Sequence, residues 1–326
     1  MKEKIITKKI LKWYDLNKRS LPWRKKLSNQ KRQYYTLISE FMLQQTQVTT
    51  VIPFFNRFIK NLPSMKFLAK VNEKRLIKFW EGLGYYSRAR NLKKTAQIVI
   101  KKFNGKLPNN IEDLLSLPGI GNYTANAILA IAFNKPYIPL DGNIERVLKR
   151  YLFLKKSKEI QKNNLIEKKS IFGIASRSGD YAQALMELGA LICKPKNPLC
   201  NQCPISINCK SFKRKDFLLV KNVKKNKDKF FILKVYKKDQ RYLLIKNTKF
   251  NFLKNLSIFP MKELSNPKNF NETLNFKMSN MNMNIKIQYS KDNQKFSSAH
   301  WFDRKKLDSY MLPSFTKKVV QYLEKN

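Results

Sequence analysis

Four cysteines close together in the sequence give the strongest chemical signal in the chain. They all fall within 17 residues, with six, two and five residues between successive members: Cys193, Cys200, Cys203 and Cys209. Four thiolates at this spacing can surround one centre, and soft sulfur ligands suit zinc or an iron–sulfur cluster. Zinc ribbons usually carry two C-x2-C pairs, whereas this segment has one. The spacing therefore favours a [4Fe-4S] cluster, with unrelated buried cysteines as the weaker alternative.

The segment Ser39–Val48 holds a single carboxylate, Glu40, among neutral side chains. In a helix, Leu37 and Leu43 share the face of Glu40, so we expect this carboxyl to be partly desolvated and its pKa to be raised. Such a carboxyl can act as a general acid near neutral pH. The alternative is a solvated glutamate at a helix edge, which is the commoner environment for this residue type.

A second carboxylate, Asp141, begins the triplet Asp141-Gly142-Asn143, and a helical pattern follows from Ile144. On local grounds Asp141 or Asn143 is expected to be the N-cap of that helix. A catalytic role requires in addition that Asp141 faces a cleft opposite Glu40, which linear spacing does not show. Both interpretations stay open at this level.

The motif Leu117-Pro118-Gly119-Ile120-Gly121 separates two amphipathic helical patterns. Glycines in a tight turn let backbone N–H groups approach a phosphate, and the following helix directs the positive end of its dipole to the same place. The pattern predicts a helix–hairpin–helix unit that binds the DNA backbone without reading bases. Pro and Gly also occur in connections between helices that bind no ligand, so the motif alone is weak evidence. The prediction rests on the location of the motif between two amphipathic helical patterns.

The segment Trp80–Arg90 interleaves aromatic, glycine and arginine residues. Such a loop can insert a ring into a base stack while its arginines, Arg88 and Arg90, neutralise phosphates. Packing of Trp80 in a core is the structural alternative.

Composition limits the class of protein. The 326 residues are enough for about two domains, and 43% of them are hydrophobic, which excludes general disorder. Lys and Arg number 67 against 22 Asp and Glu, and the net charge of +45 indicates a polyanionic partner such as nucleic acid. A/T-rich codon usage is the alternative source of this charge. No signal peptide or membrane span is predicted, and the clustered cysteines indicate a reducing, cytoplasmic compartment.

The arrangement of patterns along the chain predicts two domains. Residues 1–210 are helical with short polar turns and include the cysteine loop, so we predict an all-α domain. The Lys- and Asn-rich residues 211–228 are typical of an exposed linker. Residues 229–326 combine short β-type runs with a final helix, as in α+β domains. The runs 230–236 and 241–247, separated by the turn-like KKDQ, predict a β-hairpin.

Taken in order, these motifs resemble the adenine DNA glycosylases of the MutY type, within the helix-hairpin-helix DNA glycosylase superfamily. The matching segments, between about residues 8 and 210, are LPW, SEFMLQQTQV, WEGLGYYSRARN, LPGIGNYTANAIL, LDGNIERVLKR, QALMELGALIC and the four-cysteine loop. The resemblance implies a mainly α fold: a two-part all-α glycosylase domain with a [4Fe-4S] cluster, followed by a C-terminal Nudix-like domain. It also implies a monomer in the cytoplasm, at the nucleoid, that removes adenine mispaired with 8-oxoguanine or guanine from double-stranded DNA.

The resemblance further assigns roles to individual residues. Glu40 is expected to protonate N7 of adenine so that the base leaves neutral, and Asp141 to stabilise the oxocarbenium-like sugar. Tyr123 and Asn143 match positions that orient these two carboxylates. The target base must be flipped out of the duplex, and the residues expected to contact DNA or line the base pocket are Arg24, Gln45, Thr46, Leu83, Tyr85, Gly119 and Gly121.

Two other functions compete with this one. The related endonuclease III-like glycosylase/lyases carry a nucleophilic lysine two residues after the second hairpin glycine, where this chain has Tyr123. Without that amine no Schiff base forms, so strand cleavage by this route is not expected. A DNA-binding protein without enzymatic activity is the third alternative, which release of adenine would exclude.

The C-terminal part departs from the pattern of the resembled family. No dense acidic helix of the Nudix hydrolase type falls between residues 250 and 280, so we expect a domain that reads DNA without metal-dependent hydrolysis. The family's Phe-Ser-His reading loop is best matched by Met278-Ser279-Asn280, in which Ser279 is expected to contact the lesion. Phe296-Ser297-Ser298 is the competing choice, and the nearby His300 is expected to be structural.

Overall fold

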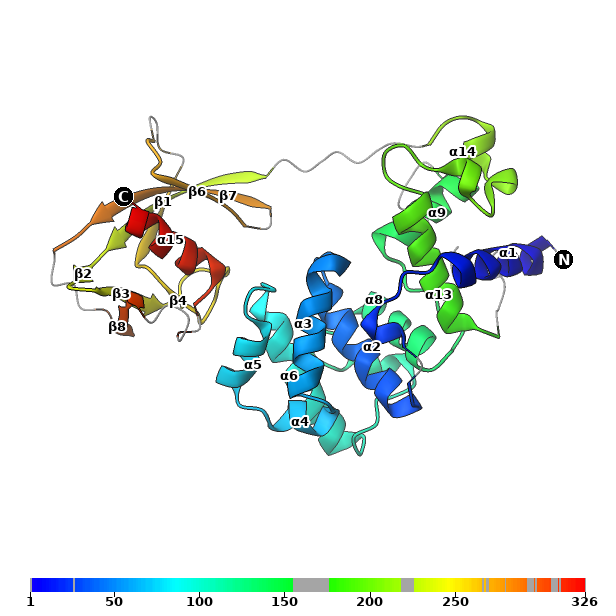
Figure 1. Cartoon of the computed structure of the whole chain (residues 1–326), viewed down its shortest axis with the longest axis horizontal. Coiled ribbons are helices and arrows are strands. Elements are labelled where there is room, and N and C mark those ends of the chain that lie inside the picture. The colour runs from blue at the N-terminus through cyan, green and yellow to red at the C-terminus, as the bar shows by residue number, and fades with distance from the viewer. Residues whose placement is uncertain are drawn as a thin grey trace. The chain divides into compact units, whose positions relative to one another are not determined.

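The computed structural model describes residues 2–25, 27–154, 176–217, 226–265, 267, 270–278, 280–291, 296, 298–305, 310 and 312–325. The chain forms two compact units, one of residues 1–76 and 87–221 and the other of residues 77–86 and 222–326. The first is helical, and the second contains the strands (Figure 1), so the predicted helical part followed by an α+β part is confirmed. None of the described helices is long and apolar enough to cross a membrane.

The helical unit is built from two groups of helices (Figure 1). The first group comprises α2 (Asn29–Leu43), α3 (Val48–Asn61), α4 (Met65–Lys70), α6 (Tyr86–Lys102), α7 (Ile111–Leu115), α8 (Asn122–Ala127) and the π-helix η2 (Ile128–Ala132). The second comprises α1 (Lys2–Asn17), α9 (Gly142–Leu152), α13 (Ser178–Glu187) and the π-helix η3 (Leu188–Ile192). Helix α5 (Glu73–Trp80) spans the division between the two compact units.

Apolar side chains at helical spacing hold each group together. Ile10 of α1, Ile144 of α9 and Leu185 of α13 are fully buried in a shared core, and Leu37 and Phe41 of α2 are fully buried in the other group. Full burial of a side chain of this size contributes about 1.5–3 kcal/mol. The helical periodicity predicted for this half of the chain is therefore confirmed.

The helix that carries Glu40 ends earlier than the sequence predicts. A single helix through Ser39–Val48 is expected from the pattern, but α2 ends at Leu43 and α3 begins only at Val48. Gln45 lies between them with a φ of 56°, in the left-handed region that ends a right-handed helix. The segment after Glu40 is therefore a turn.

Arg88 of α6 stabilises this turn. Its guanidinium is 7% exposed, and Nη1 donates to the carbonyl oxygens of Phe41 and Met42 at 3.1 and 2.9 Å and also to that of Gln44. These are carbonyls that the end of a helix leaves without an intrahelical donor. The prediction that Arg88 neutralises a DNA phosphate is therefore wrong, because its charge is buried against backbone.

The predicted hairpin lies between α7 and α8. Gly119 has a φ of 81°, and a Cβ at this position would lie 2.9 Å from Cε1 of Phe41. Gln44 and Thr95 tie the turn to the helices behind it, since Gln44 Nε2 donates to the carbonyl of Gly119 and Thr95 Oγ1 to that of Pro118. The turn is thus fixed on α2 close to Glu40.

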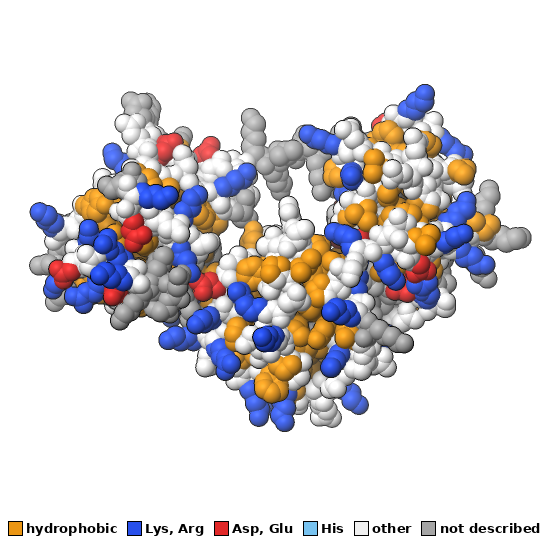
Figure 2. Space-filling view, in the orientation of Figure 1, with side chains coloured by type: hydrophobic (Ala, Val, Ile, Leu, Met, Phe, Trp, Pro, Cys, Tyr) orange, Lys and Arg blue, Asp and Glu red, His pale blue; other side chains and the backbone are white. Residues whose placement is uncertain are grey.

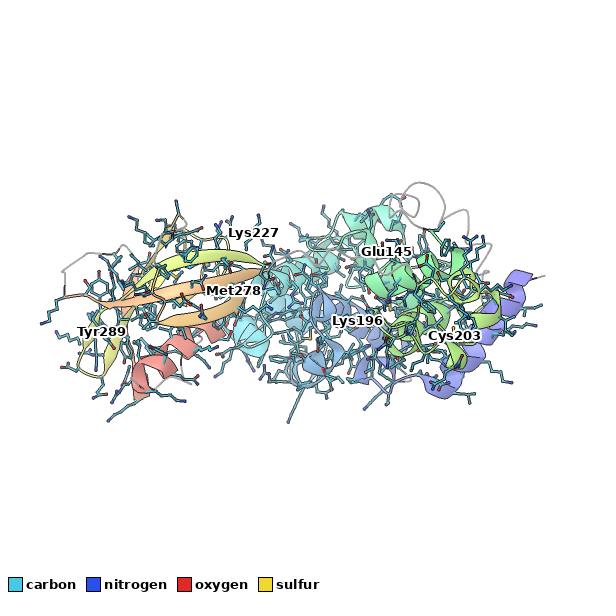
Figure 3. The ribbon with its side chains drawn as sticks, turned by 90° about the horizontal axis from the view of Figure 1, so that it is seen from above. Glu145, Lys196, Cys203, Lys227, Met278 and Tyr289 are labelled. Carbon is cyan, nitrogen blue, oxygen red and sulfur yellow. The ribbon has the colours of Figure 1, made fainter. Side chains whose placement is uncertain are left out.

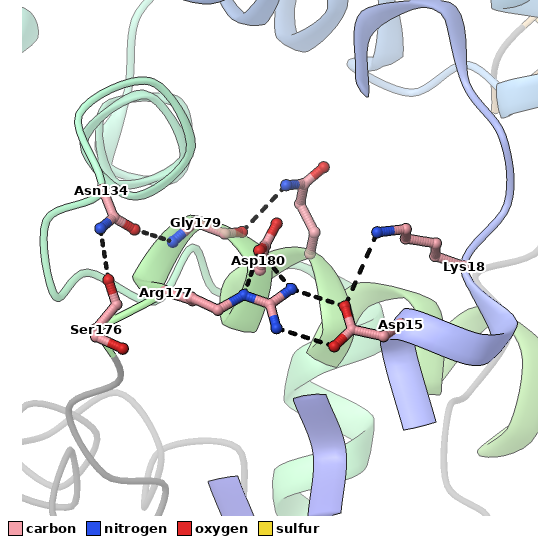
Figure 4. Close-up of polar contacts among 8 residues, drawn as sticks. Asp15, Lys18, Asn134, Ser176, Arg177, Gly179 and Asp180 are labelled. Atoms are coloured by element: carbon pink, nitrogen blue, oxygen red, sulfur yellow. Dashed lines mark hydrogen bonds and ion pairs between the residues drawn. The ribbon is translucent and has the colours of Figure 1, made fainter. Parts of the chain in front are cut away.

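Polar contacts at the start of α13 fasten it to its neighbours (Figure 4). The guanidinium of Arg177 makes two hydrogen bonds to Asp15 of α1, at 2.9 and 2.7 Å, and a third to Asp180 at 2.7 Å. Asn134 bridges the carbonyl of Ser176 and the N–H of Gly179. At Gly179 a Cβ would lie 2.8 Å from the carbonyl oxygen of Ala130, so α13 passes η2 at backbone contact.

The second unit contains two sheets. Sheet A has the order β5-β1-β7-β6, with β1 and β7 parallel; in sheet B, β3 pairs with β2, β4 and β8. The strands are β1 (Lys227–Val235), β2 (Lys237–Lys238), β3 (Arg241–Lys246), β4 (Ser257–Ile258), β5 (Met261–Leu264), β6 (Leu274–Met278), β7 (Met281–Tyr289) and β8 (Ala299–Asp303). Helix α15 (Ser314–Lys325) packs Phe315, Val319 and Val320 into the apolar core beneath them.

The predicted hairpin between residues 230–236 and 241–247 is wrong, although both runs are strands. β1 pairs with β5 and β7, whereas β3 belongs to the other sheet. The chain changes sheets at Tyr236, and only the short β2 forms a hairpin with β3 around Asp239, whose φ is 53°. The turn was located correctly, and β1 and β3 both contribute to one core, with Phe231 and Leu233 from β1 and Tyr242 and Leu244 from β3.

We predict that Gly119→Ala lowers the free energy of unfolding by at least about 1–2 kcal/mol, because alanine in the left-handed region is strained and its Cβ meets Phe41. Gly121→Ala is the matched control, since its φ is −100° and nothing lies within 4 Å of the added Cβ. Urea unfolding of the three proteins measures the difference. Equal stability of both variants would contradict this account of the turn.

Candidate active site

A cavity of about 590 Å³ in the helical unit collects all four predicted catalytic residues and several of those predicted to contact DNA. Its walls come from η1 (Pro22–Arg24), α2 and the turn after it, the start of α8, the start of α9, and α13. The predicted residues that line it are Arg24, Glu40, Gln45, Thr46, Gly121, Tyr123, Asp141 and Asn143. Folding therefore brings both candidate carboxylates into one cavity.

Glu40 is 4% exposed, so the interpretation as a solvated edge glutamate is wrong. Burial raises the pKa of Glu40 to about 7, against a hydrogen bond from Tyr123 that lowers it, while the charge of Asp141 adds to the rise. Among the described residues its Oε2 atom has no hydrogen-bond partner. Glu40 is therefore a carboxyl that holds its proton near neutral pH and has one oxygen available inside the cavity.

Asp141 is both a helix N-cap and a wall of the cavity, so the two interpretations left open by the sequence are compatible. Its Oδ1 accepts from the N–H groups of Asn143 and Ile144 at 3.0 and 2.7 Å, and its Oδ2 from the Asn143 amide at 3.1 Å. Burial raises the pKa of Asp141, and these three donors oppose the rise. Because donors stabilise the charged form, Asp141 is the carboxyl better suited to remain ionised.

Helix α9 connects Asp141 with the cysteine loop. Arg146 donates to Asn143 Oδ1 at 2.8 Å, and also to the carbonyls of Gly189 and Cys193, both at 2.7 Å. One turn later Arg150, 3% exposed, donates to carbonyls of the loop and lies 3.5 Å from Sγ of Cys193. The amide that holds Asp141 is thus itself held by Arg146 of α9, which also donates to the first cysteine of the loop.

The four cysteines border one small cavity of about 30 Å³. The loop consists of short turns: η4 (Cys200–Gln202), η5 (Ser206–Asn208) and α14 (Lys210–Lys213). All four thiols are free. As the side chains lie, no group of three or more His, Cys, Asp or Glu in the described ranges is arranged to hold a single metal ion. Ser211 beside the loop is fully buried, and its Oγ has no partner there.

The residues expected to contact DNA differ in exposure. Gln45 is exposed in the turn after α2, and Thr46 beside it is half-buried. In the other unit, Tyr85 is 43% exposed with a φ of 47°, whereas Leu83 is 5% exposed. Tyr85 thus presents an aromatic ring to solvent; the predicted contact of Leu83 with DNA is untested and stays a prediction.

The expected reading loop lies at the tip of the β6–β7 hairpin. Met278 pairs with Met281, which leaves a two-residue turn, and the carbonyl of Asn280 accepts from the N–H of Lys227. Ser279 lies outside the described residues, as does Ser297 of the competing segment. Figure 3 shows Met278 and Lys227 at the same end of sheet A, with Tyr289 at the other. His300 lies on β8 opposite Leu244, where burial lowers its pKa.

Comparisons with known proteins place this chain among DNA repair enzymes. Residues 38–170 match the HhH-GPD superfamily of base excision DNA repair proteins. The chain is 38% identical over 267 residues to the adenine DNA glycosylase of Buchnera aphidicola subsp. Schizaphis graminum, which covers 78% of this chain and 74% of that protein. The chain belongs to the adenine DNA glycosylase family.

Two further similarities describe the extent of this relationship. The adenine DNA glycosylase of Buchnera aphidicola subsp. Baizongia pistaciae is 45% identical over 224 residues, 67% of this chain and 61% of the length of that protein. A thermostable thymine-DNA glycosylase structure matches with a TM-score of 0.58 at 28% identity, over 65% of this chain and 97% of that one. The predicted glycosylase fold of the helical unit is therefore confirmed.

The family motifs left one buried carboxylate of the cavity without a role. Glu187 is fully buried; its two oxygens accept from Arg19, both at 2.8 Å, and one also from Arg24 at 3.0 Å. Burial alone would raise the pKa of Glu187, but the two arginines outweigh it, and the pKa is lowered. The only sequence signal was its place in the segment QALMELGALIC, since the arginines lie more than 160 residues away.

We predict that Glu187→Gln destabilises the protein at pH 7, toward the lower end of the roughly 3–5 kcal/mol typical of breaking a buried ion pair, because Arg19 is partly exposed. Since the pKa of folded Glu187 is lowered, its contribution is complete above the unfolded value of about 4.3 and is lost as the pH falls through the folded value. Urea unfolding from pH 7 to 3.5 should show the gap to wild type narrowing at acid pH. Exposed Glu112→Gln is the control, and a gap independent of pH would contradict the assignment.

Proposed function

We propose that the protein is a monofunctional adenine DNA glycosylase that hydrolyses the N-glycosidic bond of adenine mispaired with 8-oxoguanine or guanine in double-stranded DNA. The observation that carries the proposal is the presence of two different carboxyls in one cavity: Glu40 has a pKa of about 7 and one oxygen without a described partner, whereas Asp141 accepts three hydrogen bonds that favour its ionised form. Pairs of carboxyls kept apart in this way divide the acid and the charge-stabilising roles between them.

Glu40 is the proton donor. Adenine leaves poorly as an anion, and a proton on N7 lets the C1′–N9 bond break with its electron pair retained on a neutral base. The pKa of about 7 keeps a large share of Glu40 protonated at neutral pH, and its Oε2 has no competing partner in the described cavity. Tyr123 holds the carboxyl through a hydrogen bond and stays un-ionised, because burial raises its own pKa.

Asp141 stabilises the sugar cation that remains after the base departs. Its negative charge is fixed by three N–H donors, so no reorganisation is needed when positive charge develops at C1′. Water then adds to C1′, or to a transient ester with Asp141, and its proton passes to the carboxylate of Glu40, which restores the acid.

The lining of the cavity supports a monofunctional enzyme. No lysine is present among the described residues that border it, and Tyr123 occupies the position where a lyase would carry its amine. Without an amine at C1′ no Schiff base forms, and the abasic product is released with its backbone intact.

DNA is held through its backbone while the target base enters the cavity. The hairpin glycines, the exposed Gln45 and Tyr85 and the half-buried Thr46 are our candidates for contacts with the distorted duplex. Figure 2 shows Lys and Arg side chains spread widely over the visible face, with few acids between them, which suits a polyanion. The protein would act as a monomer on the chromosome, in the cytoplasm.

The second unit is proposed to be a Nudix-like reader of the base opposite adenine. The tight β6–β7 turn presents Met278 and Asn280 at the end of sheet A, on either side of Ser279. Ser279 would hydrogen-bond the oxidised base, and Met278 would supply a flexible apolar contact. Asn280 donates a hydrogen bond but, unlike the histidine of the resembled loop, never becomes cationic, so selectivity for 8-oxoguanine should be reduced.

The function is tested by single-turnover release of adenine from duplexes with adenine opposite 8-oxoguanine, guanine and thymine. Release from the first two substrates alone supports the proposal. Trapping of a covalent adduct with borohydride would instead identify a lyase. Binding without release of adenine from any duplex would leave a DNA-binding protein.

We predict that Glu40→Gln abolishes excision while duplex binding persists, because an amide has no proton to deliver. In the wild type the protonated form is active, so the single-turnover rate should fall up to about tenfold per pH unit above about pH 7 and level off below it, until Asp141 becomes protonated. Asp141→Asn should be nearly as damaging as Glu40→Gln. A flat profile between pH 6 and 9, with chemistry rate-limiting, would remove Glu40 from the role of acid.

We also propose that the four cysteines hold a [4Fe-4S] cluster. The donor set fits this group: four free thiols border one cavity, the Arg150 guanidinium lies beside one of them, and the buried Ser211 hydroxyl nearby lacks a partner. When bound, the cluster would crosslink the loop, with Lys194, Lys196 and Lys210 on its outside. This chain's Arg146 and Arg150 already hold the loop to α9 from within.

We predict about four irons per chain and broad absorbance near roughly 400 nm in protein purified without oxygen. Cys203→Ser should lower the iron content and destabilise the loop, because each ligand closes part of it. Metal analysis with visible spectroscopy decides the question. Zinc without iron in the same preparation would exclude the cluster.

A further inference from the structure

The two faces of sheet A differ sharply in chemistry. Phe231, Leu233, Met283 and Ile285 point into the core and are fully buried. Residues alternate between faces along a strand, so the intervening positions of β1, β5, β6 and β7 form the other face. We name this surface the outer face of sheet A, and Figure 3 views the strands from above.

The outer face carries lysine and amide side chains. Its exposed or half-buried polar residues are Asp228, Lys234, Lys262, Asn275, Lys277, Asn282, Asn284, Lys286 and Gln288, and the half-buried Phe230, Ile232 and Leu264 lie among them. The one acid among these strand positions, Asp228, accepts a hydrogen bond from Asn282 Nδ2 at 2.8 Å, and Asn226 donates to Asn282 Oδ1 at 2.9 Å. No described acid forms an ion pair with Lys262, Lys277 or Lys286.

The register places the three lysines within the length of a short segment of duplex. Lys262 and Lys286 flank Ile232 in one row, two strand spacings or about 10 Å apart. Lys277 pairs with Asn282, four residues before Lys286, which corresponds to about 13 Å along the sheet. A duplex carries one charge per about 1.7 Å of its axis, so this length spans roughly eight phosphate charges.

The outer face is also continuous with the hairpin formed by β6 and β7, which carries the expected reading loop and is called the reader hairpin below. Lys277 directly precedes Met278, at the tip where β6 turns into β7. A duplex in contact with that tip therefore lies within reach of Lys277. Lysine charges supply affinity, and asparagine amides can donate to phosphate and sugar oxygens without reading the sequence.

We propose that the outer face of sheet A binds the sugar–phosphate backbone of duplex DNA beside the reader hairpin. The inference rests on the proposed function for the identity of the polyanion. This contact does not depend on base sequence. It would increase the affinity for the duplex whose base the turn between β6 and β7 contacts.

The test compares two triple variants by binding to a fully paired duplex over a range of salt concentrations. In one, Lys262, Lys277 and Lys286 are each changed to Gln; in the control, Lys237, Lys238 and Lys246 of sheet B are changed in the same way. Each phosphate contact contributes about 0.9 to the slope of log Kobs against log salt. The first variant should therefore lose up to about 2.7 of the slope, the single variant Lys286→Gln about 0.9, and the control none.

Equal slopes for wild type and the first variant would overturn the proposal, as would equal losses in both triple variants, which would mean a general effect of charge. Tighter binding of the wild type to double-stranded RNA than to DNA, with the same dependence on the three lysines, would also overturn it. Because the duplex contains no mispair, binding is measured independently of adenine release. Failure of the proposed glycosylase activity would thus be recognised separately, in the release assay.

Discussion

The central constraint on the cavity is the raised pKa of one carboxyl group, Glu40, inside a chain whose net charge is +45. Surrounding positive charge favours ionisation of any carboxyl, and Arg24 acts on Glu40 in that direction. Removal of water opposes it most strongly, and the nearby charge of Asp141 helps. Glu187 belongs to the same balance, because it takes the guanidiniums of Arg24 and Arg19 as its own partners. Three carboxyls with three different environments therefore share one cavity, and only Glu40 lacks a cationic or backbone partner strong enough to strip its proton.

Helix α9 links the cavity that holds these carboxyls to the cysteine loop. Its first residues hold Asp141, and its later turns carry Arg146 and Arg150 into the cysteine loop. Because a helix is rigid over this length, the cavity and the loop cannot move independently without breaking buried hydrogen bonds to charged groups, each worth roughly 1.5–3 kcal/mol. The cysteine loop consists only of short turns, and its position is therefore set by the helix that also forms part of the candidate active site.

The sequence predicted the positions of the helices and strands better than it predicted which strands and side chains contact one another. Helical spacing and the hairpin motif located α2, α7, α8 and α9, and all four predicted catalytic residues line the cavity. Burial of Glu40 was the less favoured local interpretation, because the groups that surround it in the cavity, such as Tyr123 and Asp141, are distant in sequence. Arg88 looked like a phosphate ligand and is instead a helix cap, and β1 left the expected hairpin for a parallel partner more than 50 residues later. Glu187 was missed for the same reason: what makes it special is two arginines that only the fold brings near.

Three glycines of this chain, Gly119, Gly179 and Gly189, lie where the neighbouring atoms leave no room for a side chain, which limits how the gene can mutate. The chain keeps only nine glycines, while its wealth of Lys, Asn and Ile matches a drift toward A/T-rich codons, and glycine codons begin with two guanines. At Gly119 a side chain would meet the ring of Phe41, at Gly179 the backbone of η2, and at Gly189 the Cβ of Asn143 at 2.6 Å. A substitution that replaces one of these glycines by a residue with a side chain inserts atoms where helices touch or where Asn143 reaches Asp141. Packing therefore selects for glycine at these three positions. We expect their codons to keep both guanines even where the rest of the gene drifts toward A/T-rich codons, because the neighbouring atoms leave no room for a side chain.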